Sequence, residues 1–139
     1  MKAVLCVLVL GSVMASAQTQ PAARDLTAVS NEVLAAIQTV KNHASGLLNE
    51  VGKKQPDRQT VQALTAQAVA QAKQIRKLIE ELDAFYAKMP EAQQSALRRS
   101  WSVATILNGC MESAADSLAG TSPDVWGEVR TGAECAQRR

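Results

Sequence analysis

The sequence has little of the chemistry from which most catalytic and metal sites are built. Its 139 residues include a single histidine, His43, so a multi-histidine metal site cannot form. A catalytic His43 would need a nucleophile and an orienting group, and the sequence shows no pattern that supplies them. No pair of carboxylates lies inside an apolar run, and no glycine-rich phosphate loop is present. We therefore expect a protein that is not an enzyme and that holds no metal or cofactor.

An excess of charge of either sign is also missing. Fifteen Lys and Arg residues stand against 13 Asp and Glu residues, which gives a formal net charge of +2. A strongly basic nucleic-acid binder and an acidic disordered tail are both excluded by this balance. Basic pairs at Lys53–Lys54, Arg98–Arg99 and Arg138–Arg139 could contact an acidic partner, although solvation is the simpler interpretation. We expect no nucleic-acid partner.

The one long apolar run is at the N-terminus, Ala3–Leu10, and it has less than half of the roughly 20 residues that a membrane span needs. Lys2 precedes this run, and Ala15–Ala17 forms an A-x-A cleavage site. These features predict a signal peptide over residues 1–17 and a single secreted domain over 18–139, with no membrane span in the mature chain. An uncleaved anchor or a buried N-terminal helix is the alternative.

Cysteine is scarce, and its placement agrees with export. Cys6 lies in the predicted signal peptide, which leaves Cys110 and Cys135 in the mature chain. An even number of cysteines in an oxidising compartment predicts a disulfide between them. Closing this loop would stabilise the fold by roughly 3–4 kcal/mol. Two free thiols or an intermolecular bridge are the alternatives.

No segment alternates between apolar and polar residues with a period of two, so we expect no strands. Instead, apolar residues recur in steps of three and four, which is typical of a helix face. In the first periodic segment these positions are Leu26, Val29, Val33, Ile37, Val40, Ala44, Leu47 and Val51. This helix would begin after an Asp25 N-cap and stop at Gly52. A second helix is predicted from Asp57 to Met89, ended by Pro90.

Two further helices follow. The segment 91–119 carries apolar residues over a wide arc, which predicts the central, most buried helix, with Gly120 after its last residue. Ser122–Asp124 would open the fourth helix, with the serine as N-cap. If these two helices are antiparallel, Cys110 and Cys135 come level with each other. The predicted fold is an all-α, secreted, up-down four-helix bundle whose C-terminal hairpin is clamped by this disulfide.

The four aromatic residues fall on the apolar faces of these helices. They fill the core or, together with two methionines, line a cavity for an apolar ligand. The candidate lining residues are Phe85, Tyr86, Met89, Trp101, Met111 and Trp126.

Export, a rigid bundle and the lack of a catalytic set together predict a non-enzymatic binding protein. It would act by protein–protein interaction in an extracellular fluid, for example as an effector or inhibitor. The alternative is an extracellular carrier of lipid or another small apolar ligand, which the amphipathic helices would also suit.

Overall fold

A computed structural model describes residues 26–139. The predicted signal peptide, Cys6 and the predicted N-cap Asp25 lie outside this range.

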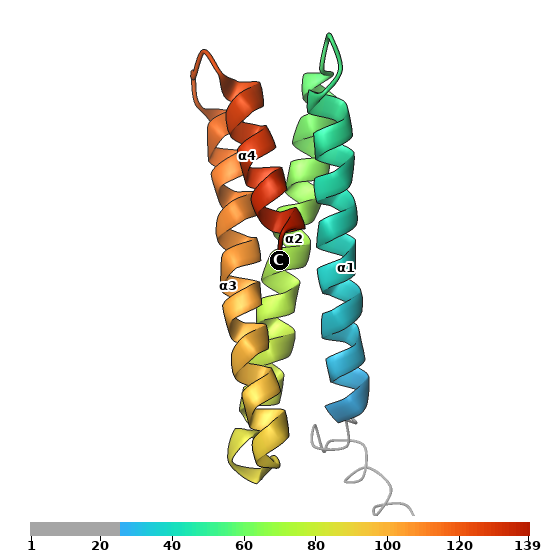
Figure 1. Ribbon diagram of the computed structural model, residues 1–139, viewed down its shortest axis with the longest axis vertical. Coiled ribbons are helices and arrows are strands. Elements are labelled where there is room, and N and C mark those ends of the chain that lie inside the picture. Colours follow the sequence, from blue (N-terminus) through green and yellow to red (C-terminus); the bar gives the residue numbers. More distant parts are fainter. Residues whose placement is uncertain (1–25) are drawn as a thin grey trace, which may run out of the picture.

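The described part of the chain is all-helical and contains no strand, as predicted (Figure 1). Its elements are α1 (Leu26–Val51), α2 (Arg58–Asp83), the short 3₁₀ turn η2 (Tyr86–Lys88), α3 (Glu91–Ala119) and α4 (Val125–Gln137). Within these residues, no helix combines the length and the apolarity that crossing a membrane requires.

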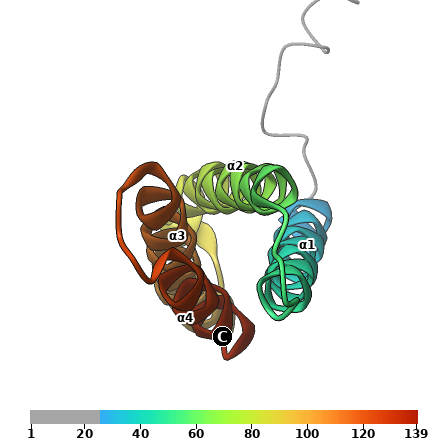
Figure 2. The same ribbon diagram turned by 90° about the horizontal axis from the view of Figure 1, so that it is seen from above.

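The four helices pack as a ring around one core. α2 lies between α1 and α3, and α4 packs beside α3 and also contacts α1 (Figure 2). The prediction that 91–119 forms a central helix is therefore wrong, because α3 has α2 and α4 as its neighbours, like any other member of the ring. Its wide apolar arc serves two neighbours that lie on different sides of it.

The periodic face predicted for α1 is confirmed in its main positions. The side chains of Val29, Val33, Val40, Ala44, Leu47 and Val51 are all buried, whereas Leu26 and Ile37 are half-buried. The same 3–4 spacing buries Val61, Ala68, Ala72, Ile75, Ile79 and Leu82 on α2. Helix formation and core formation thus follow from one pattern.

The second helix is shorter than the predicted Asp57–Met89. α2 ends at Asp83, and the chain turns through η2 before Pro90. Gln94, in the first turns of α3, explains how this turn is held: its Nε2 donates to the carbonyl oxygens of Tyr86 at 3.0 Å and of Met89 at 3.1 Å. These bonds satisfy the carbonyl group of Met89 and give a second donor to that of Tyr86, which also accepts from Met89 N at 3.1 Å. Pro90 has no N–H group with which a longer helix could pair the Tyr86 carbonyl.

Capping side chains set the helix starts. Asp57 accepts hydrogen bonds from the backbone N–H groups of Gln59 and Thr60 at the start of α2. At α4 the N-cap is Asp124, which accepts from Gly127 N, and not the predicted Ser122. The serine lies outside the helix, where its hydroxyl accepts from Asp124 N.

Glu50 anchors the connection between α1 and α2. Its buried carboxylate accepts from Lys53 Nζ at 2.5 Å and from Asp57 N at 3.0 Å. The hydrogen bond from Lys53 and then that from Asp57 lower the pKa of Glu50 below its ordinary value of 4.5. The carboxylate therefore holds this end of the bundle in its ionised form.

The predicted disulfide is present: Cys110 on α3 is bonded to Cys135 on α4, with their Cα atoms 5.8 Å apart. Gly132 lets the two helices come this close. A Cβ atom at Gly132 would lie 2.8 Å from the carbonyl oxygen of Cys110 and 3.0 Å from Ala114 Cβ. This role of Gly132 was not predicted from the sequence.

Candidate functional site: a groove beyond the end of α4

One of the four helices, α4, is much shorter than the other three, and this difference opens one side of the bundle. α4 has 13 residues and α3 has 29. α4 ends level with Lys41 of α1, because Gln137 Nε2 donates to the Lys41 carbonyl oxygen at 2.8 Å. In Figure 1 the chain's C-terminus accordingly lies about halfway along α1 and α3. The α1 segment 26–40 has no α4 beside it.

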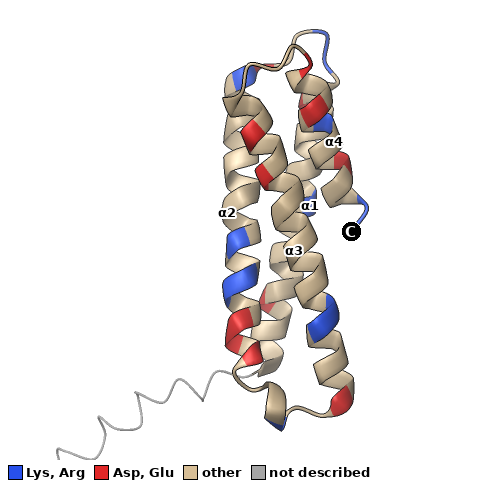
Figure 3. Ribbon diagram, turned by 90° about the vertical axis from the view of Figure 1, so that its left-hand side faces the viewer, with Lys and Arg blue, Asp and Glu red and all other residues tan. Residues whose placement is uncertain are grey.

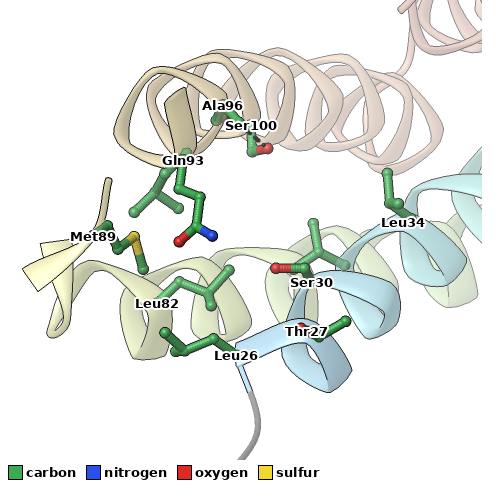
Figure 4. A pocket seen from close by; sticks show the side chains of 11 residues that line it. Leu26, Thr27, Ser30, Leu34, Leu82, Met89, Gln93, Ala96 and Ser100 are labelled. Carbon is green, nitrogen blue, oxygen red and sulfur yellow. Dashed lines mark hydrogen bonds between the residues drawn. The ribbon is translucent and has the colours of Figure 1, made fainter. Parts of the chain in front are cut away.

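A groove of about 320 Å³ lies beyond the end of α4, between α1 and α3. Figure 4 shows Leu26, Thr27, Ser30 and Leu34 of α1 on one side, Gln93, Ala96 and Ser100 of α3 opposite, and Leu82 of α2 between them. Val33, Met89 and Leu97 complete the lining. Apolar side chains therefore make up most of the surface.

The floor of the groove is part of the core. Val33, Leu82 and Leu97 are 3%, 6% and 5% exposed, one from each of the three helices present at this level. These residues belong to the packed core, so the floor of the groove does not depend on mobile side chains.

The α1 wall carries the molecule's most unusual apolar residue. Leu34 is 64% exposed, and it is the one large hydrophobic residue in 26–139 recorded as exposed. It lies off the 3–4 pattern of α1, next to Val33. Seven residues separate Leu34 from Lys41, which places both on one face of the helix. α4 contacts that face through Gln137.

On α3, too, the groove wall and the surface that contacts α4 lie on one face of the helix. Ala96 and Val103 precede Cys110 by 14 and seven residues, so all three share one face of α3. Cys110 is bonded to α4. The face that α4 covers near Cys110 thus continues, uncovered by α4, along the groove.

Four polar residues border the groove: Thr27, Ser30, Gln93 and Ser100. The Ser100 hydroxyl donates to the Ala96 carbonyl oxygen at 3.1 Å, within its own helix. The Gln93 side chain extends from α3 into the space between the walls (Figure 4). The eleven lining residues include no acid, base or thiol, so the groove offers hydroxyl and amide groups only.

Basic residues lie on the two elements that meet at the end of the groove nearest α4. Arg99 is exposed three residues after the groove residue Ala96, which places it beside the α3 wall. Arg138 and Arg139 follow α4, and Arg138 pairs with Glu134 at 3.2 Å. Elsewhere on the face drawn in Figure 3, blue and red segments are interspersed.

The six predicted lining residues are not brought together around one pocket. Met89 lines the groove, and Met111 is fully buried in the core. Tyr86, Trp101 and Trp126 are half-buried and packed against the core, and Phe85 is half-buried in the turn after α2. Trp126 lies in the first turn of α4, at the opposite end of the molecule from Phe85 and Tyr86 (Figure 1).

The remaining polar candidates form no second site. His43 is half-buried on α1 and is not among the groove residues. A shallow polar hollow beside the α3–α4 connection is lined by Glu112, Asp116 and Glu128. In the part of the chain that the structure describes, no three His, Cys, Asp or Glu residues are grouped so as to hold a metal ion.

Sequence reasoning missed the groove because it looked for bulky and aromatic residues. The available signal was Leu34, a large apolar residue outside the predicted apolar face of its helix, together with the unequal lengths of the third and fourth helices. No family model, curated protein or solved structure matches the chain, so its function has to be inferred from this geometry.

Proposed function

We propose that the protein is an exported, up-down four-helix bundle that acts as a non-enzymatic extracellular binding protein. Its groove takes an apolar segment of a partner protein. The observation that carries this proposal is the 64% exposure of Leu34 on the wall of a groove whose floor is buried core.

Exposed leucine beside an apolar groove favours binding on energetic grounds. Burying a leucine side chain fully is worth roughly 1.5–3 kcal/mol. An apolar groove with a few polar groups at its border is typical of a binding site. Because Leu34 is 64% exposed, contact with a partner could gain at most about two thirds of this free energy, without any rearrangement of the floor.

The disulfide supports the exported location, because such bonds persist mainly in oxidising compartments. The N-terminal sequence supports it independently, through Lys2, the short apolar run and the A-x-A site. The composition of the groove supports a binding role over catalysis, because a nucleophile or general acid needs a titratable neighbour and the lining has none.

A paired substitution tests this function. Leu34→Glu places a charge on the groove wall, whereas Ala35→Glu places the same charge on the same helix, turned away by about 100°. The mature protein and both variants are immobilised and exposed to the extracellular fluid of the source organism. A partner retained by the unmodified protein and by Ala35→Glu, but lost with Leu34→Glu, supports the proposal. Equal retention by all three overturns it.

A second candidate function is the transport of a small apolar ligand. The volume of the groove, about 320 Å³, favours it, because this falls within the range of small-molecule sites. Native mass spectrometry of the purified protein tests it: a bound lipid that Leu34→Glu releases would favour transport over protein binding.

A further inference from the structure

We infer that the groove is the docking site for an amphipathic α-helix of another protein, which lies end to end with α4 and completes the four-helix arrangement. This inference rests on the proposed function and names the form of the partner. Three observations support it. The groove continues the surface of α1 and α3 against which α4 packs, it offers no free backbone hydrogen-bonding groups, and arginines lie near one of its ends.

The surface of α1 and α3 against which α4 packs already binds a helix within the molecule. Cys110 of α3 and the backbone of Lys41 on α1 hold α4 from its two sides. One heptad earlier on the same two faces stand Val103 and Leu34. The walls that accept one helix therefore continue past its end, and a second helix can extend the same contact.

An extended peptide would fit the groove poorly. The walls and floor are helices, whose interior backbone N–H and C=O groups bond within each helix. An extended segment needs partners for its own backbone groups, and the polar side chains of the groove are few. A helix pairs its backbone internally and presents only side chains.

The dimensions define the partner further. The uncovered α1 segment 26–40 is roughly 20 Å long at 1.5 Å per residue, enough for about four helical turns. α4 fits closely against its neighbours through buried Gly132, Ala133 and Ala136. On the α3 wall, Gln93 extends into the groove near Met89, and the small residues Ala96 and Ser100 leave free volume beside it for side chains of the partner. We therefore expect leucine-sized side chains at positions i, i+4 and i+7 of the partner helix.

Charge indicates an acidic partner. Arg99 and Arg139 are exposed on the elements that meet at the α4 end of the groove, where Arg138 pairs with Glu134. Glutamates on the polar face of the partner helix would gain attraction there, which salt would weaken.

Residues 18–24 of this chain are an unsuitable occupant on chemical grounds. Their sequence, QTQPAAR, has no leucine-sized apolar side chain. A second copy of the chain is a competitor, since two grooves facing each other would cover Leu34 of both.

The test uses synthetic 16-residue peptides and the purified mature protein, with fluorescence anisotropy as the readout. The first peptide carries leucines at helical spacing with glutamate and glutamine elsewhere. The second has the same composition in scrambled order, the third has two central prolines, and the fourth replaces glutamate with lysine. Each is titrated against the unmodified protein, Leu34→Glu and Ala35→Glu, and light scattering reports the oligomeric state.

We expect the first peptide to bind at least about tenfold more tightly than the scrambled and proline peptides. Leu34→Glu should remove this preference and Ala35→Glu should keep it. The lysine peptide should bind more weakly than the first, by an amount that shrinks at high salt. Circular dichroism should show helix gained on binding.

Three results would overturn the inference. If the proline peptide bound as tightly as the first peptide, and Leu34→Glu removed this binding, the groove would take extended segments. The proposed function would then stand without the helix. A dimer that Leu34→Glu dissociates would assign the groove to a second copy. Leu34-dependent binding of laurate with no binding of any peptide would contradict both the helix and the protein partner.

Discussion

The two ends of the bundle use the same helix faces for different purposes. At the end that α4 covers, α3 and α4 are joined by the Cys110–Cys135 bond, and Arg130 Nη2 of α4 donates to the Val51 carbonyl oxygen of α1 at 3.3 Å. At the other end, the same faces of α1 and α3 border the groove. One end thus has its apolar faces covered within the chain, and the other leaves them accessible.

Polar contacts between helices follow the same division. Arg58 Nη2 of α2 donates to the Leu118 carbonyl oxygen of α3 at 2.7 Å, which ties two further helices together at the covered end. At the groove end, the contacts surround the α2–α3 turn, where Arg98 lies over the Tyr86 ring at 5.8 Å from its centroid. The half that the disulfide holds together can support the open half, because one continuous core runs through both.

The largest expected effect is a difference in the free energy of unfolding between two leucine substitutions on α1. Leu47 is fully buried at the covered end, and Leu47→Ala should lower the free energy of unfolding by about 2–5 kcal/mol. Leu34→Ala at the groove should change it by no more than about 0.5 kcal/mol, because little buried surface is lost. Urea denaturation followed by circular dichroism measures both. A large loss for Leu34→Ala would mean that the groove end is a structural core.

Removing the disulfide should have the next largest effect. Replacing Cys110 and Cys135 with serine opens a loop with a sequence separation of 25 and should cost about 3 kcal/mol. Hydrogen exchange should accelerate in α4 and in the facing part of α3 more than around the groove. Uniform acceleration over all four helices would show that the two ends do not open separately.

Substitutions of two glycines test how closely α4 packs against α3. Gly132→Ala would place a Cβ atom 2.8 Å from the Cys110 carbonyl oxygen, so α4 must shift, at a cost of about 1–3 kcal/mol. Gly109→Ala, also in a helix, meets no atom within 4 Å and should stabilise the protein by up to about 1 kcal/mol. Thermal unfolding of both variants measures the contrast. Stabilisation by both would contradict close packing of α3 and α4.

Much of the covered end was predictable from the sequence. The 3–4 spacing predicted α1, and the bounds of α3 were predicted as Glu91–Ala119. The disulfide followed from the count of cysteines and their distance from the turn at Gly120. These predictions succeeded because each depends on local sequence, through helix periodicity or the placement of a turn.

Features that depend on particular side-chain hydrogen bonds, or on where one helix ends against another, were not predictable in the same way. The turn between α2 and α3 is held by Gln94, whose side chain binds the carbonyl groups of Tyr86 and Met89. The start of α4 depends on which of two neighbouring capping residues, Ser122 or Asp124, fits the turn. The groove depends on where α4 ends against α1, and the aromatic residues gave no sign of it because most of them pack against the core.

The smallest expected effect concerns acid, and it should act at the covered end. Hydrogen bonds from Lys53 and Asp57 lower the pKa of Glu50 in the folded protein below its ordinary 4.5, so the unfolded chain binds more protons in the interval between the two values. Stability from Glu50 is therefore complete above about pH 4.5 and is lost as the pH falls through the lower, folded pKa. Glu50→Gln should be less stable than the unmodified protein at pH 7, and the difference should shrink as the pH falls below 4.5.

Glu112→Gln, on the exposed surface of α3, controls for the change in net charge. Urea midpoints measured from pH 7 to pH 2.5 test this, and a difference between Glu50→Gln and the unmodified protein that stays constant with pH would show that Glu50 stabilises the connection by packing rather than by charge.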